Sequence, residues 1–77
     1  MPTILFQDGY RFYFFSNEHE PIHVHVKFGS GMARFDLSDG VVLLESRGMK
    51  VQELHKAQDL AEANAELLRR KWHECFD

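Results

Sequence analysis

Apolar and polar residues alternate along the first half of the chain, a pattern typical of β-strands that bury one face. Alternation is clear over residues 22–28 and 32–37, whereas residues 10–15 carry aromatic side chains on both faces. Together with the turn residues, these runs predict strands over residues 3–6, 10–15, 22–28, 32–37 and 41–44. Turn residues separate most of the predicted strands. Asp8-Gly9 is a strong hairpin signal, and two further turns are predicted at Gly29-Ser30-Gly31 and Ser38-Asp39-Gly40. The sequence therefore predicts an antiparallel meander of four or five strands.

The period changes from about Lys50 onward, where apolar residues recur at helical spacing through Leu54, Leu68 and Trp72. As one helix this stretch would be roughly 40 Å long, which exceeds what such a sheet covers. A break near Asn64 is therefore expected, giving either one bent helix or two helices packed on one face of the sheet. The fold class is α+β, with Trp72 in the core and Cys75 as a small packed hydrophobe.

Length and composition indicate a single domain over residues 1–77, with 44% hydrophobic residues for one modest core. The net charge of −3 argues against a protein that coats nucleic acid, but it leaves room for a small basic site. A lone cysteine, no signal-peptide pattern and no long apolar run favour a cytoplasmic protein without membrane contact. A domain of this size gains stability from association, so a homodimer or a cognate partner is expected.

Candidate chemistry concentrates in the run Ser-Asn-Glu-His-Glu-Pro-Ile-His-Val-His-Val at residues 16–26. Strand alternation places His23 and His25 on one face, with Cα atoms roughly 6.6–7 Å apart. One interpretation is a divalent metal such as zinc, held by His23 and His25 with His19, Glu18 or Glu20 from the preceding loop. An open coordination position holding water would make this a small hydrolase.

A second interpretation needs no metal. His23 and His25 would act as base and acid in RNA cleavage, because imidazole titrates near neutrality. Arg47 would hold the phosphate near the helix start, with Lys27, Arg34 or Lys50 as other cations. Tyr13 or Trp72 would stack a base. In a third interpretation the histidine face is a catalytically silent protein interface, so the sequence leaves open whether the protein is an enzyme.

The same residues resemble a known family. Met1-Pro2-Thr3, the aromatic run at residues 12–15, the motif at residues 16–26, Arg47-Gly48 and Trp72-His73-Glu74 are similar to the small bacterial proteins called domain of unknown function 4160. Ile22 stands where the family usually has a second proline. Lys50-Val51 replaces the usual hydroxyl residue at the helix start, which leaves no obvious side-chain cap.

The resemblance implies a two-gene bacterial module, since such proteins resemble toxin–antitoxin components and often neighbour a gene of the domain of unknown function 2442 type. The leading hypothesis is a toxin–antitoxin-type component with a His-centred site that cleaves or binds RNA, acting with a cognate partner. The alternatives are a metal-binding module or metal-dependent hydrolase, and a silent interaction domain.

Overall fold

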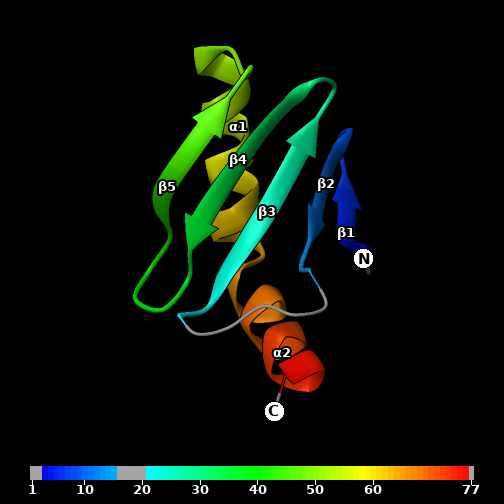
Figure 1. Ribbon diagram of the computed structural model, residues 1–77, viewed down its shortest axis with the longest axis vertical. Helices are drawn as coiled ribbons and strands as arrows, with labels where there is room; N and C mark the ends of the chain where they lie inside the picture. Colours follow the sequence, from blue (N-terminus) through cyan, green and yellow to red (C-terminus); the bar gives the residue numbers. More distant parts are fainter. Residues whose placement is uncertain (1–2, 16–20, 77) are drawn as a thin grey trace.

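One antiparallel sheet followed by two helices makes up the fold in the computed structural model, which describes residues 3–15 and 21–76 (Figure 1). The strands run in the order β1-β2-β3-β4-β5 across the sheet. They are β1 Thr3–Gln7, β2 Tyr10–Tyr13, β3 His23–Phe28, β4 Gly31–Asp36 and β5 Val42–Arg47, and they precede α1 Val51–Ala63 and α2 Ala65–Phe76. The predicted α+β meander is confirmed with five strands, and the helical stretch is two helices.

The turns use the residues that the sequence singled out. Asp8 and Gly9 both have positive φ, 55° and 85°, as a two-residue turn of type I′ requires. The last strand is the one that differs most, because β5 extends to Arg47 rather than ending at residue 44. The prediction ended the strand where the apolar run ends, but Glu45, Ser46 and Arg47 also pair with β4. A register irregularity opposite Arg34 and Phe35 gives β5 an extra residue.

Both helices lie behind the same face of the sheet, and Asn64 separates them (Figure 1). The Leu60 carbonyl near the end of α1 accepts two hydrogen bonds from Asn64, one from the side-chain amide at 2.8 Å and one from the backbone N–H at 3.1 Å. At the start of α1, Lys50 provides no side-chain cap. The Glu53 carboxylate instead accepts the Lys50 backbone N–H at 2.9 Å, and this bond partly replaces the missing hydroxyl cap.

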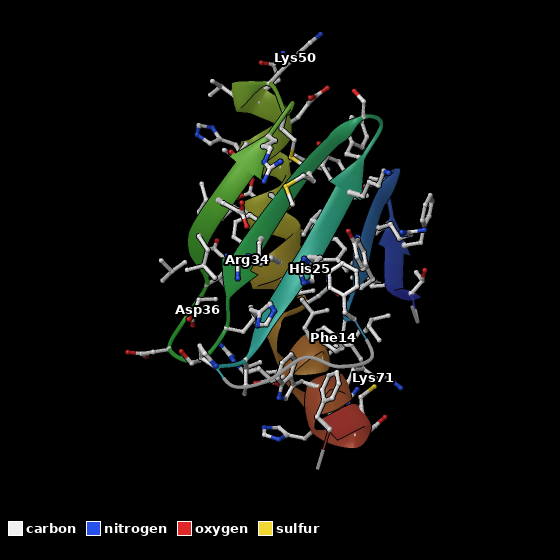
Figure 2. All side chains as sticks on the ribbon, viewed as in Figure 1. Phe14, His25, Arg34, Asp36, Lys50 and Lys71 are labelled. Atoms are coloured by element: carbon white, nitrogen blue, oxygen red, sulfur yellow. The ribbon has the colours of Figure 1, made fainter. Side chains whose placement is uncertain are left out.

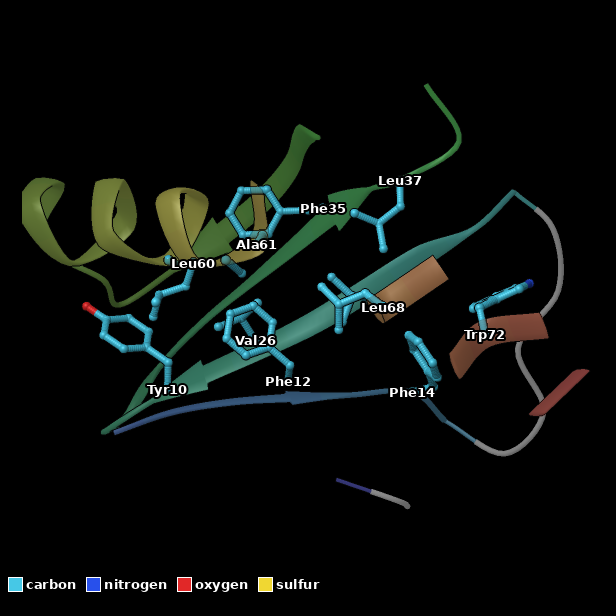
Figure 3. Packing of buried hydrophobic residues seen from close by; sticks show 13 residues of the cluster. Tyr10, Phe12, Phe14, Val26, Phe35, Leu37, Leu60, Ala61, Leu68 and Trp72 are labelled. Carbon is cyan, nitrogen blue, oxygen red and sulfur yellow. The ribbon is translucent and has the colours of Figure 1, made fainter. Parts of the chain in front are cut away.

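The core lies between the sheet and the helices (Figure 3). Strand alternation supplies its sheet side, and α1 and α2 supply Leu60, Ala61, Leu68 and Trp72. The prediction of a buried Trp72 is confirmed, with 1% of the residue exposed. The prediction for Cys75 is wrong, because this side chain is exposed. The end of α2 extends past the strands, so its last turn has less sheet to pack against (Figure 1).

Within the described ranges, no helix is long and apolar enough to cross a membrane.

We predict that Gly31→Ala destabilises the protein by about 1–3 kcal/mol, as overpacking a close contact does. A Cβ at position 31 would lie 2.7 Å from the Gly48 carbonyl oxygen, a backbone atom that cannot rotate away. Denaturant unfolding of Gly31→Ala measures the loss, with exposed Ser30→Ala as the control. Equal stability of the two variants would contradict the close approach.

Candidate functional site

The sheet face opposite the helices, here called the open face, carries most of the candidate chemistry (Figure 2). Its residues alternate with the core residues along each strand and share the cross-strand register. The open face comprises Phe6, Arg11, Tyr13, Phe15, His23, His25, Lys27, Met32, Arg34, Asp36, Val42, Glu45 and Arg47.

A row of cations crosses this face near one end of the sheet. Register pairs link Phe6 to Arg11, Arg11 to Lys27, Lys27 to Met32, and Met32 to Arg47. We call Arg11, Lys27 and Arg47 the cationic row. They come from three different strands, so only the sheet register brings them into line.

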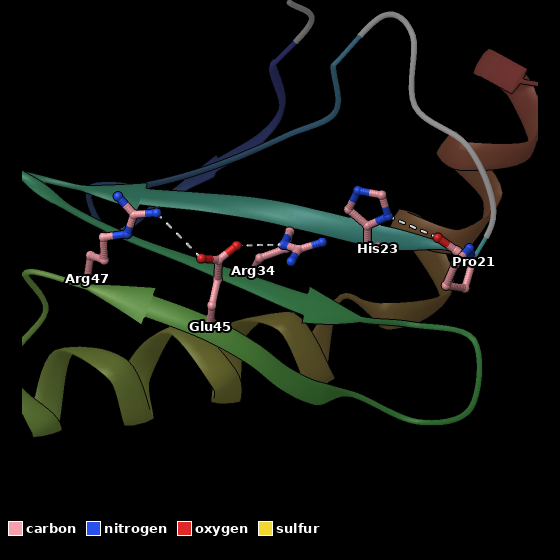
Figure 4. Close-up of polar contacts among 5 residues, drawn as sticks. All are labelled: Pro21, His23, Arg34, Glu45 and Arg47. Atoms are coloured by element: carbon pink, nitrogen blue, oxygen red, sulfur yellow. Dashed lines mark hydrogen bonds and ion pairs between the residues drawn. The ribbon is translucent and has the colours of Figure 1, made fainter.

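The next row joins aromatic, imidazole and charged groups. Tyr13 pairs with His25, His25 with Arg34, and Arg34 with Glu45. The Arg34 Nε donates to Glu45 Oε1 at 3.0 Å, and Arg47 lies 3.8 Å from the other carboxylate oxygen (Figure 4). Glu45 therefore links the two rows and neutralises part of their charge.

The His25 imidazole packs against the rings of three neighbouring residues, Tyr13, Phe15 and His23. Its imidazole stacks on Tyr13 with ring centroids 5.3 Å apart, and it meets Phe15 at 4.4 Å and His23 at 5.2 Å. The residue is 8% exposed, the one buried polar side chain among the described residues. This packing fixes the orientation of the His25 ring.

His23 is more open and has a defined tautomer. Its Nδ1 lies 2.9 Å from the Pro21 carbonyl oxygen (Figure 4). Because a carbonyl only accepts, Nδ1 must carry the hydrogen, and in the neutral ring Nε2 then holds the lone pair. The ring also lies 5.4 Å from that of Trp72, so α2 supports the site from the end of the sheet.

Asp36 is the register partner of His23 and is held by Ser38. Its Oδ1 accepts hydrogen bonds from the Ser38 N–H at 2.7 Å and from the Ser38 hydroxyl. These bonds lower the pKa of Asp36 below its ordinary value, and the positive potential of nearby His23 adds a smaller lowering. Asp36 is therefore a fixed carboxylate beside the histidine pair at neutral pH.

The structure brings His23 and His25 together but places Arg47 elsewhere. Arg47 was expected between the last strand and the helix, yet it lies inside β5, highly exposed and near Glu45. Arg34, rather than Arg47, is the cation directly beside His25. Lys50 stands at the start of α1.

The metal hypothesis depends on residues outside the described ranges, where Glu18, His19 and Glu20 all lie. Among residues 3–15 and 21–76, no group of three His, Cys, Asp or Glu side chains is placed to hold a metal ion. His23 and His25 would supply two ligands, so a third would have to come from that loop.

Base stacking on Trp72 is excluded by its burial. Tyr13 is also buried, and its ring lies against His25 and the Arg11 guanidinium, 4.8 Å from the centroid. Sequence reasoning missed Phe6 as an accessible aromatic group, and it missed Arg11. The signal that would have found Phe6 and Arg11 is the register of the hairpin around Asp8-Gly9, which places them opposite each other on the open face.

We predict that Ser38→Ala raises the pKa of Asp36 toward 3.8, its ordinary value. A carboxyl with a lowered folded-state pKa stabilises the fold above its unfolded pKa, and this stability is lost as pH falls through the folded pKa. Carboxyl-carbon NMR titration measures the shift. The gap in unfolding free energy between wild type and Ser38→Ala should narrow below pH 3.8. A gap that does not change with pH would contradict this assignment.

Comparison with known proteins gives a family but no activity. Searches of curated proteins and of solved structures found no match. A family model described as Domain of unknown function (DUF4160) matches residues 9–73 of the 77-residue chain, a range that contains β2 to α1 and most of α2. The chain therefore belongs to the DUF4160 family.

Proposed function

We propose that this protein binds single-stranded RNA on its open face, as the RNA-directed component of a toxin–antitoxin-type pair. The observation that carries the proposal is the concentration of cations and accessible aromatic rings on one face of an acidic protein. Four Lys and Arg side chains against two carboxylates give the described open face a charge of +2, whereas the whole chain carries −3.

The spatial arrangement of aromatic and cationic side chains on the open face also supports the proposal. Phe6 is 67% exposed and Phe15 36%, so both rings are accessible to a base. Arg11 and Arg47 lie three strand spacings apart, about 14 Å, a length that several nucleotides of a single strand would cover. Antiparallel sheets with surface aromatic residues and neighbouring cations bind single-stranded RNA by stacking bases and contacting phosphates.

RNA cleavage is a second candidate, favoured by the hydrogen bond between His23 and Pro21. Because Nδ1 carries the hydrogen in that bond, the lone pair of neutral His23 is on Nε2, the atom that would act as the base toward a 2′-hydroxyl. His25 would protonate the leaving oxygen, and Arg34 beside it would stabilise the phosphate. A divalent ion held by His23, His25 and Glu18, His19 or Glu20 is the metal-dependent form of the same hypothesis.

Membership of a two-gene module is supported by the family resemblance and not by the geometry. In such a pair a cognate protein would bind this chain and control access to the open face. A silent interaction domain is the competing hypothesis, and it predicts no affinity for RNA.

We predict that the double variant Lys27→Gln/Arg47→Gln weakens binding of a fluorescent oligouridylate. Each phosphate contact on a single strand contributes about 0.7 to the slope of log affinity against log salt, so the slope should fall by about 1.4. Fluorescence anisotropy across a salt series measures this. The matched control is Arg70→Gln/Lys71→Gln on α2, which removes the same charge and should bind almost as wild type does. Equal losses in the two variants would contradict a specific role for the open face.

For cleavage, we expect His23→Gln to abolish RNA breakdown and growth arrest on induced expression, at matched protein levels. His73→Gln, an exposed histidine on α2, is the control and should retain both. Repeating the cleavage assay with a chelator separates the two chemistries: activity that survives indicates acid–base catalysis, and activity that is lost indicates a metal. Cleavage and arrest unchanged in His23→Gln would refute a His-centred catalytic site.

A further inference from the structure

Two cations of the open face stand directly opposite each other on neighbouring strands. Arg11 of β2 and Lys27 of β3 are register partners. Like charges in this position destabilise an antiparallel pair. Within residues 3–15 and 21–76, neither side chain forms an ion pair with an acidic residue. An anionic ligand bound between Arg11 and Lys27 would therefore relieve a repulsion that the fold leaves in place.

Two acidic groups on neighbouring elements are already engaged with other cations. Glu45 of β5 contacts Arg34 at 3.0 Å and Arg47 at 3.8 Å. Asp8, in the turn between β1 and β2, contacts Lys56 of α1 at 3.1 Å. These contacts neutralise charge elsewhere and leave the two opposed cations uncompensated in the described part of the chain.

The Arg11 guanidinium packs on a ring that is itself fixed. Its Cζ lies 4.8 Å from the centroid of the Tyr13 ring, which stacks on His25. The Arg11 Nε is buried and has no hydrogen-bond partner among the described residues. Because a buried donor without an acceptor is unfavourable, an oxygen ligand that pairs with this guanidinium would be favoured. The planar fork of an arginine is suited to phosphate, which it binds through two parallel N–H bonds.

We propose that Arg11 and Lys27 bind a terminal phosphate of the RNA, a phosphomonoester, so that the open face prefers strands with a phosphorylated end. The inference rests on the proposed RNA binding and names the class of RNA that is bound. Its basis is charge. A phosphodiester within the strand carries one negative charge, whereas a phosphomonoester carries about −1.5 to −2 at pH 7. Two opposed cations without a carboxylate partner match the phosphomonoester better.

The aromatic residue beside this pair suits the end of a strand. Phe6 of β1 is the register partner of Arg11 and is 67% exposed. Because β1 is an edge of the sheet, Phe6 lies at the outer end of the cationic row. Opposite residues on neighbouring strands have Cβ atoms about 4.5–5.5 Å apart. The terminal base would therefore stack on Phe6 while its phosphate contacts the two cations.

The test is calorimetric titration of the full chain with three unlabelled oligouridylates of one length, carrying a 5′-phosphate, a 3′-phosphate, or hydroxyls at both ends. We expect one phosphorylated form to bind at least about tenfold more tightly than the hydroxyl form, as one additional charge-assisted hydrogen bond allows. The preferred form identifies which end is bound. Arg11→Gln and Lys27→Gln should each lower this ratio toward one. The matched control is Arg70→Gln, an exposed cation on α2, which should keep the ratio.

Equal affinity for the three RNAs, or a ratio unchanged in both variants, would overturn this inference and leave RNA binding intact. No binding of any RNA would instead refute the proposed function and the inference together. NMR titration of wild type with the 5′- and 3′-monophosphates of uridine covers the case in which a variant fails to fold. The Arg11 Nε–H and Lys27 amide signals should shift, and uridine without phosphate should shift them much less. Shifts confined to residues outside β1, β2 and β3 would overturn the site.

Discussion

Packing of one sheet face against two helices is the constraint on which the rest of this structure depends. Phe12, Val24, Val26 and Phe35 alternate into the core, where they meet residues of α1 and α2. Because side chains alternate along a strand, burying this set fixes every intervening residue on the opposite face. The open face is thus a direct consequence of core packing, and its residues are held in register without contributing much to the core.

Two features give that face chemical character. The first is the pair of aromatic rings, Tyr13 and Phe15, that packs against the His25 imidazole. The second is His23 at the end of the sheet, which contacts the Pro21 carbonyl and the Trp72 ring. Around them, the register lines up cations that are far apart in sequence. A chain with net negative charge can therefore present a cationic surface, because its excess acidic residues lie elsewhere.

Much of the fold could be predicted because the signals were local. Alternation, turn residues and the helical period gave the strands, the break near Asn64 and the burial of Trp72. Arg47 was misplaced because the polar end of β5 is a strand only through its pairing with β4, where Arg47 lies opposite Met32, and no local pattern records that pairing. The pairing of His23 with His25 followed from spacing alone. The cationic row could not be predicted in this way, because Arg11, Lys27 and Arg47 are brought into line only by the sheet register. Glu18, His19 and Glu20, the other proposed metal ligands, lie outside the described residues.

The most direct test of the account is NMR titration of the isotope-labelled protein with a single-stranded oligouridylate. The account predicts that amide shifts concentrate in β2, β3 and β4, that the ring signals of Phe6, Phe15 and His23 move with them, and that α1 and the exposed side of α2 stay unchanged. Shifts confined to the helices, or no shifts at low salt, would contradict the claim that the open face is the functional surface.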